Sequence, residues 1–287
     1  MKQSLLIITF IIIFKTTFAQ QASPIVKVSF KGKKDPFAEL RISGFSSWIK
    51  QPSIYIEGYD GDNLTIEPYN IIPSKTIQAD TIGLRNVTSS IKVLYPAPSE
   101  DAPEVKELPD RVQISIPTAR IPGANAYKAL LIKVPRNIHL KLLAGFILSD
   151  AGIISLKDLT GELEISGYAS LIEINNISGP LSLSSSITTS SKIKISHIKW
   201  IKPPVDKEKT LLYISSQSSD IDISLPGDLK ATFNISSTNG EIYSDLNLVR
   251  RHPASNVLNN FSGDLNGGGI PITIITNYGN VFLRKEK

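Results

Sequence analysis

The sequence predicts an all-β protein, and within that class a β-solenoid: a right-handed β-helix-like stack of short strands preceded by an irregular β segment. Three observations predict it. Apolar and polar residues alternate with a period of two from about Asn137 to Lys287. The alternating segments begin at roughly nine- to ten-residue intervals, a spacing typical of short stacked or paired strands. Ser, Thr and Asn are frequent between the apolar positions. A β-sandwich is the alternative.

The segment Gly161–Ser166 illustrates the alternation. Leu163 and Ile165 share one face, whereas Glu162 and Glu164 share the other, as in a strand with one buried side. One such layer cannot bury its apolar face alone, so neighbouring layers must stack. The same pattern recurs at Leu181 and Leu183, Ile193 and Ile195, Ile221 and Ile223, Ile242, Ile272 and Ile274, and Val281 and Leu283.

Hydroxyl and amide side chains are expected on the outside of this stack, where they can lie in register on neighbouring layers. The stretches concerned are Ser184–Ser186, Thr188–Ser191, Ser215–Ser219 and Ser236–Asn239. The aromatic residues of the last part are expected to fill the core: Phe233, Tyr243, Phe261, Tyr278 and Phe282.

The end of the chain carries a turn and a charged strand. Gly267–Gly269 suits a turn with positive φ, and Ile270–Pro271 after it excludes a phosphate-binding loop. The final strand closes with Arg284–Lys287 and is expected to be an edge strand, on which such charges discourage further pairing.

Residues 1–19 are expected to be a signal peptide. Lys2 supplies the positive start, Leu5–Phe14 the apolar run, and Thr17-Phe18-Ala19 the small residues before a cut. Cleavage after Ala19 predicts an exported bacterial protein in the periplasm, on the outer surface or outside the cell. An uncleaved membrane anchor is the alternative, but the run is short for a span. We therefore expect no stable membrane insertion after cleavage.

Residues 20–136 form the expected leading β segment. Its clearest part is Pro52–Pro68, where two alternating runs flank a turn and predict a hairpin. The Pro- and acid-rich stretch Pro96–Pro109 is expected to be an exposed loop. Arg111–Pro117 and Tyr127–Pro135 are predicted strands that lead into the repeats.

Residues 137–287 form the expected β-repeat domain, which two loops interrupt. Trp200–Lys209 combines prolines with charges, and Leu248–Gly263 is a longer insertion. Because binding residues often lie on loops of a rigid scaffold, a partner site is first sought there. No long helix is expected; Ala151–Leu159 and Asn247–Asn259 are the candidates for short ones.

Candidate metal ligands are sparse. His139, His197 and His252 lie far apart, and no pair has the spacing of a metal site. His139 is expected to face away from the apolar column of its strand. The group Asp60, Asp62, Asn63 and Glu67 could surround calcium, but Asp and Asn are also ordinary turn residues.

Asp220 and Asp222 alternate with Ile221 and Ile223, so both carboxylates point outward together. Paired carboxylates can cleave glycosidic bonds, yet no Arg or Lys partner is evident nearby, which favours a solvated face. The chain has no cysteine, which excludes thiol chemistry. We therefore predict no enzyme, and no catalytic, cofactor-binding or metal-binding residues.

The charge balance excludes one class of partner. The formal charge is +5, and loss of Lys2 and Lys15 with the signal peptide leaves +3. So mild a charge, without aromatic residues among the basic ones, does not indicate nucleic-acid binding.

Several segments together resemble the bacterial putative-adhesin domain family of unknown function, whose members are secreted β-repeat proteins. They are PSIYIEGYDGDNLTIE at Pro52–Glu67, YKALLIKVPRNIHLKL, LKDLTGELEIS, INNISGPLSLS at Ile174–Ser184, SSTNGEIYSDL at Ser236–Leu246 and LNGGGIPITIITNYGNVFLRK at Leu265–Lys285. The Ser-rich run at Ser184–Ser191 departs from that family. The resemblance implies a β-solenoid-like fold at the cell envelope or surface, and it offers no catalytic residues.

The predicted function is that of a secreted, non-catalytic adhesion or interaction protein of a Gram-negative-type envelope. Its partner would be a surface, a glycan or another protein. A carbohydrate-binding or weakly polysaccharide-active β-helix protein is one alternative, and an envelope signalling accessory is another.

Overall fold

The structure, a computed structural model, describes residues 26–33, 35–43, 53–68, 103–117, 129–145, 152–186, 191–199, 211–251 and 259–286. Its strands are β1 Val26–Ser29, β2 Phe37–Ser43, β3 Ser53–Tyr59, β4 Asn63–Pro68, β5 Glu104–Glu107, β6 Val112–Pro117, β7 Ala129–Pro135, β8 His139–Ala144, β9 Ile153–Leu159, β10 Leu163–Gly167, β11 Leu171–Ile177, β12 Leu181–Ser185, β13 Ser191–Ile198, β14 Leu212–Ser216, β15 Ser219–Leu225, β16 Ala231–Ser237, β17 Ile242–Ser244, β18 Leu248–Arg250, β19 Asn260–Leu265, β20 Ile270–Thr276 and β21 Val281–Lys285.

The prediction of an all-β chain is confirmed, because no helix occurs in these described ranges. The two proposed short helices are wrong where they can be checked: β9 occupies the first and β18 the start of the second. Ile153, Ile154 and Leu248-Val249 are residues of high or moderate strand preference, and they pair with neighbouring strands in the sheets.

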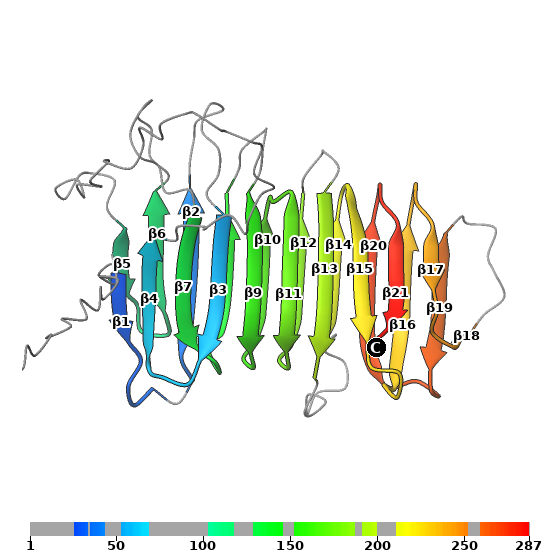
Figure 1. Ribbon diagram of the computed structural model, residues 1–287, viewed down its shortest axis with the longest axis horizontal. Helices are drawn as coiled ribbons and strands as arrows, with labels where there is room; N and C mark the ends of the chain where they lie inside the picture. The colour runs from blue at the N-terminus through cyan, green and yellow to red at the C-terminus, as the bar shows by residue number, and fades with distance from the viewer. Residues whose placement is uncertain are drawn as a thin grey trace, which may run out of the picture.

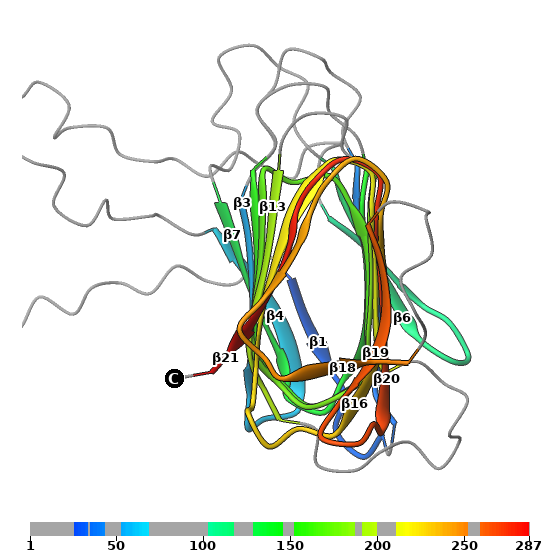
Figure 2. The same ribbon diagram turned by 90° about the vertical axis from the view of Figure 1, so that its right-hand side faces the viewer.

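The described strands form two sheets of mixed pairing (Figures 1 and 2). One sheet has the order β1-β4-β7-β3-β9-β11-β13-β15-β21-β17, and the other β18-β19-β16-β20-β14-β12-β10-β8-β2-β6-β5. Figure 2 shows the two sheets facing each other. Consecutive strands from β8 to β15 alternate between the sheets, and each pairs in parallel with the strand two places along the chain. Figure 1 shows these strands following one another along the long axis.

Parallel in-register pairing places like aliphatic residues next to one another inside. All members of the two central columns are buried. Each buried Leu or Ile contributes about 1.5–3 kcal/mol relative to exposure, so these columns dominate the stability of the fold. The columns are Leu140–Leu163–Leu181–Leu212–Ile272 in one sheet and Ile154–Ile172–Ile193–Ile221–Val281 in the other.

The leading segment is built into the same two sheets. β2 pairs with β8, and β3 pairs with β9, so strands from before and after residue 136 are direct neighbours. One set of buried residues extends from Val26 to Leu283. The proposed division at residues 136 and 137 stays a prediction.

The predicted hairpin at Pro52–Pro68 is wrong. Both strands exist, but β7 lies between them, parallel to β3 and antiparallel to β4. The turn from Tyr59 to Asn63 therefore spans two strand spacings instead of one. The runs of β3 and β4 show alternation, which predicts a strand but does not identify its neighbour.

Two further predictions about edges are corrected. Part of the expected loop at Pro96–Pro109 is β5, an edge strand exposed along its whole length and antiparallel to β6. Its residues carry no alternation because neither face is buried. The final strand β21 is not an edge, because it lies between β15 and β17. The edges at that end are β17 and β18.

Several hydroxyl groups expected outside are buried. Ser219 and Ser237 are 0% exposed, and the Ser219 hydroxyl lies 2.6 Å from that of Ser216 and 2.5 Å from that of Ser191. The Ser237 hydroxyl donates to the Gly279 carbonyl at 3.0 Å. These residues lie at strand ends where the chain turns between sheets, and there a hydroxyl can satisfy its hydrogen bonds inside. The buried serines are Ser185, Ser216, Ser219 and Ser237, and among the described residues the Ser185 hydroxyl has no hydrogen-bond partner.

Of the two predicted loops, only the ends of Leu248–Gly263 are described. Trp200–Lys209 and the expected signal peptide at residues 1–19 lie outside the described residues. Within Leu248–Gly263, β18 and β19 pair in antiparallel fashion, so the ends of this insertion belong to the sheet. Gly267 and Gly268 have φ of 84° and 81°, which confirms the predicted turn. In the part of the chain that can be inspected, no helix has the length and apolar character needed to cross a membrane.

Candidate functional site

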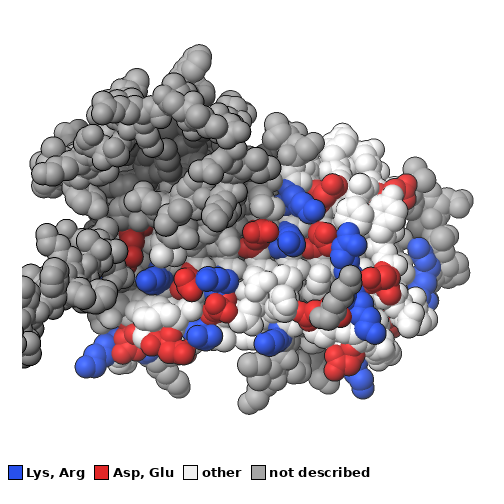
Figure 3. Space-filling view, viewed as in Figure 1, with Lys and Arg blue, Asp and Glu red and all other residues white. Residues whose placement is uncertain are grey.

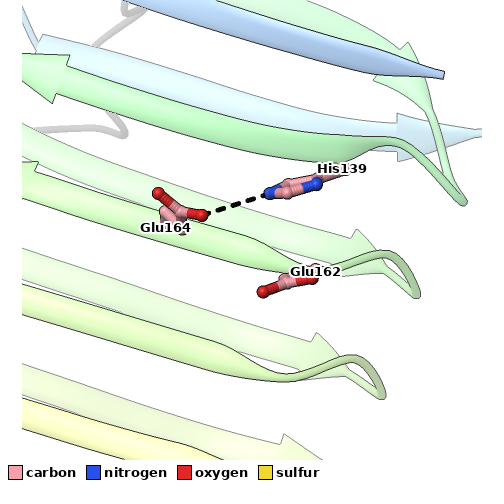
Figure 4. Close-up of side chains that lie close together, drawn as sticks. All are labelled: His139, Glu162 and Glu164. Atoms are coloured by element: carbon pink, nitrogen blue, oxygen red, sulfur yellow. Dashed lines mark ion pairs between the residues drawn. The ribbon is translucent and has the colours of Figure 1, made fainter. Parts of the chain in front are cut away.

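Three potential metal-ligating side chains meet on the outer face of the sheet that contains β8 and β10. His139 begins β8, and Glu162 and Glu164 lie at the start of β10. The strands are parallel, with Leu140 opposite Leu163 and Lys141 opposite Glu164. His139 therefore lies level with Glu162, and the period of two points all four side chains away from the core. Figure 4 shows His139 directed at Glu164, with Glu162 close by.

The donor atoms of His139, Glu162 and Glu164 lie within 4.8 Å of one another. His139 Nε2 is 3.4 Å from Glu164 Oε1, while Lys141 Nζ is 2.8 Å from Glu164 Oε2. The hydrogen bond from Lys141 is the main cause that lowers the pKa of Glu164; burial opposes it, and His139 adds to the lowering. Glu164 is thus held as a carboxylate whose two oxygens face different partners.

The His139 ring is fixed from the neighbouring strand. It stacks on Phe37 with 4.2 Å between ring centroids and 8° between planes. The Arg111 guanidinium lies 5.8 Å from the Phe37 centroid. Stacking of this kind limits rotation of the imidazole, so His139 Nε2 keeps its direction toward the carboxylates.

A charged network continues from this cluster. Glu39, on β2, is only 3% exposed although its strand position faces outward. Arg41 and Arg111 both pair with it, the latter at 3.1 Å. Two guanidinium groups neutralise the buried carboxylate, as a charge in such a place requires. This part of the face is therefore occupied by internal pairing.

The predicted calcium candidates form a turn. Asp60 pairs with Arg136 at 3.1 Å. The Asn63 amide donates to the Tyr59 hydroxyl at 3.1 Å, and that hydroxyl donates back to the Asn63 carbonyl at 2.8 Å. Asp62 offers its main-chain carbonyl to Phe30. These contacts support the turn interpretation of the segment.

His197 is explained by backbone shape. It has φ of 54°, and Asn176 and Asp158, at the matching positions of β11 and β9, have 52° and 60°. Asn, Asp and His tolerate this left-handed region better than other side chains. His197 Nε2 faces Glu286 at 3.5 Å. The third histidine, His252, lies outside the described residues.

Asp220 and Asp222 do point outward, but they have partners that the sequence did not suggest. Asp222 pairs with Arg284 at 2.8 Å, and Asp220 accepts a hydrogen bond from the Asn280 amide at 2.8 Å. Arg284 lies on β21, which follows β15 in the sheet but not in the chain. The sequence could not predict Arg284 as a partner of Asp222, because it does not show that β15 pairs with β21.

The outer face of the sheet that contains β15 and β21 carries charges of both signs side by side (Figure 3). Neighbouring strands supply opposite partners across the ladder, an arrangement that stabilises adjacent strands. The pairs are Lys157–Glu57 at 2.9 Å, Lys194–Glu173 at 3.8 Å and Arg284–Asp222 at 2.8 Å.

The prediction that five aromatic residues fill the core is confirmed for Phe233, which is fully buried, and wrong for Tyr243 and Tyr278, which are 51% and 57% exposed. Phe261 and Phe282 are partly buried. Tyr243 stacks on Phe282 with 5.2 Å between centroids, and Arg284 lies 5.3 Å from the Phe282 ring. The exposed Tyr243 ring belongs to β17, which is the edge of its sheet, so no further described strand covers this ring.

Comparisons with known proteins add little. No family model matches the chain, and no curated protein matches it. Among solved structures, a putative cell adhesion protein from Clostridium sporogenes is similar, with a TM-score of 0.47, 12% identity, and coverage of 92% of this chain and 100% of that chain. Similarity at that level supports no inference about what this chain does.

Proposed function

We propose that the protein is a secreted, non-catalytic β-solenoid that acts as an adhesion or interaction module at a bacterial cell surface or in the periplasm. The solenoid assignment is supported by the alternation of β8 to β15 between two sheets with parallel, in-register pairing. The expected signal peptide supports export.

The observation that carries the interaction role is where the exposed large apolar side chains lie. In the described part of the chain, four of them belong to the last strands and turns and one to the edge strand β5 at the other end. These four lie toward one end of the molecule, on strands of both sheets and in a turn, and that end therefore offers apolar contacts to a partner. The four are Tyr243 at 51%, Val249 at 68%, Ile275 at 38% and Tyr278 at 57%.

The non-catalytic role is supported by the paired charges of the outer faces. Asp222 and Glu173, which could otherwise act as acids or bases, are each held by a cation from the neighbouring strand. Both carboxylates are therefore engaged in contacts that join adjacent strands.

The test has two parts. The full chain, expressed in a Gram-negative host, is fractionated, and the exported form should begin at Gln20. Beads coated with that form should be retained on bacterial cells or envelope preparations, and beads coated with the Tyr243→Ala, Val249→Ser variant should be retained less. Tyr213→Ala, on the outer face of β14, is the control. Cytoplasmic retention of the uncut chain, or equal retention of wild-type and blank beads, would refute the proposal.

A second candidate function, carbohydrate binding, is favoured by the Tyr243 ring. Arg284, Phe282 and Tyr243 form a continuous stack that ends in a half-exposed ring on an edge strand. The flat face of an aromatic ring and nearby carboxylates such as Asp222 suit a sugar, which has apolar C–H faces and hydroxyl donors. A glycan array should then give signals that Tyr243→Ala abolishes and Tyr243→Phe preserves. Silence of the wild-type protein on the array would exclude this candidate.

A further inference from the structure

We propose that His139, Glu162 and Glu164 form a binding site for one divalent transition-metal ion, with Zn²⁺ as the preferred ion. This inference goes beyond the adhesion proposal and departs from the expectation of no metal ligands. The three donors come from two adjacent strands and share one outer face (Figure 4). The group mixes an imidazole with two carboxylates, and these are ligand types that zinc accepts together.

One pair of donors has the spacing of metal ligands. His139 Nε2 and Glu164 Oε1 face each other at 3.4 Å, and Nε2 is shielded from solvent. Two ligands of one tetrahedral zinc, each about 2.0–2.1 Å from the ion, lie about 3.3–3.4 Å apart. A metal ion between these two atoms could therefore bind both without moving them apart, and the third donor lies within 4.8 Å of each.

The surroundings hold two of the ligands in place. Phe37 stacks on the His139 ring and limits its rotation. Lys141 occupies Glu164 Oε2 and leaves Oε1 free for the ion. Partners that orient a ligand through its second donor are characteristic of metal sites. Lys141 and the two carboxylates leave a local charge near −1, which still favours a divalent cation.

Glu162 completes the set from the more accessible side. It is exposed, so it can move the short distance needed to close on an ion and leave a fourth position for water. The imidazole nitrogen selects zinc over calcium and magnesium, which prefer oxygen donors.

The experiment is isothermal titration calorimetry of the exported form, dialysed against chelator, with ZnCl₂, CaCl₂ and MgCl₂ in turn. The expected result is one zinc per chain, and no comparable heat with calcium or magnesium. His139→Gln and Glu162→Gln should each weaken zinc binding at least tenfold. Glu173→Gln, an exposed carboxylate on the other sheet, is the control and should bind as the wild type does. Zinc should also raise the melting temperature of the wild type and the control.

Glu162→Gln is the decisive variant, because an exposed side chain contributes little to folding and its loss leaves the structure intact. Circular dichroism should match that of the wild type. The proposal is overturned if the wild type binds no zinc, or if zinc binds equally to all variants at some other place. It is also overturned if calcium binds as tightly as zinc at this site. Each outcome is separate from the adhesion test, which uses the other end of the molecule.

Discussion

Gly179 is the position at which the structure makes its sharpest prediction. A Cβ at this position would lie 1.9 Å from the Gly161 carbonyl oxygen. The closest comfortable C···O separation is about 3.3 Å, so the two layers would have to move apart by about 1.4 Å. Gly161 has the same relation to the Ile138 carbonyl oxygen, also at 1.9 Å. Glycine is therefore required where the chain passes directly over the preceding layer.

The cost of Gly179→Ala can be worked out from its surroundings. Overpacking costs about 1–3 kcal/mol. Two main-chain hydrogen bonds beside it, Ser178 N to Leu159 O at 3.0 Å and Leu163 N to Pro180 O at 2.8 Å, would lengthen. Each contributes a net of about 0.5–1.5 kcal/mol. The lower entropy of unfolded alanine returns about 0.4–1 kcal/mol. The expected destabilisation is about 1–5.5 kcal/mol, centred at about 3 kcal/mol.

Urea unfolding, followed by the negative circular dichroism band that β-sheets give in the far ultraviolet, measures this change as a lower midpoint with an unchanged slope. The control is Gly145→Ala, where the new Cβ would be 3.4 Å from the Ile42 carbonyl oxygen, an ordinary contact. It should change stability by no more than about 0.5 kcal/mol. If Gly179→Ala behaved like the control, the close stacking of these turns would be wrong.

Three further predictions concern the core and the charged surface. Phe233→Ala, which empties a fully buried site, should cost about 3–5 kcal/mol by the same unfolding assay. Ser219→Ala leaves the buried Ser216 hydroxyl without its acceptor and should cost about 1–3 kcal/mol; an unchanged midpoint would contradict the buried network. The hydrogen bond from Arg251 holds the pKa of Asp264 below its ordinary 3.8, so the pair stabilises the fold above that pH and the contribution fades as pH falls through the lower folded pKa. The difference in melting temperature between wild type and Asp264→Asn should be constant above about pH 5 and shrink below about pH 4; a constant difference down to pH 2 would contradict it.

The alternation of apolar residues was sufficient to predict which residues lie inside. Leu163, Ile165, Leu181 and Leu183 are all buried, because a period of two has one geometric meaning in a strand. The alternation does not predict which strands pair with one another. The separation of β3 from β4 by β7 depends on which strands meet in space, and no local pattern encodes that.

Polar residues were harder to place than apolar ones. Ser219 looked like an outward position because serine is usually exposed, yet two neighbouring hydroxyls satisfy it inside. The edge strand β5 was missed because an edge strand needs no buried face.

The cluster at His139 could have been found from the sequence. Alignment of His139-Leu-Lys-Leu with Glu162-Leu-Glu-Ile by their alternating positions brings His139 beside Glu162 and Lys141 beside Glu164. The signal was the match between two repeats and not the spacing of histidines. Arg284 and Asp222 show the limit of that approach, because β21 enters the sheet out of chain order.

That order of strands bears on how the chain is completed during synthesis. β20 separates β14 from β16, and β21 separates β15 from β17, although β20 and β21 are translated after β16 and β17. Until β20 and β21 have been made, β16 and β17 have no neighbour through which to join the strands made before them. The earlier layers can assemble as they emerge, whereas β16 and β17 can join them only later. A premature stop codon just before Ile270 would therefore remove β20 and β21 and also separate β16 and β17 from those earlier layers.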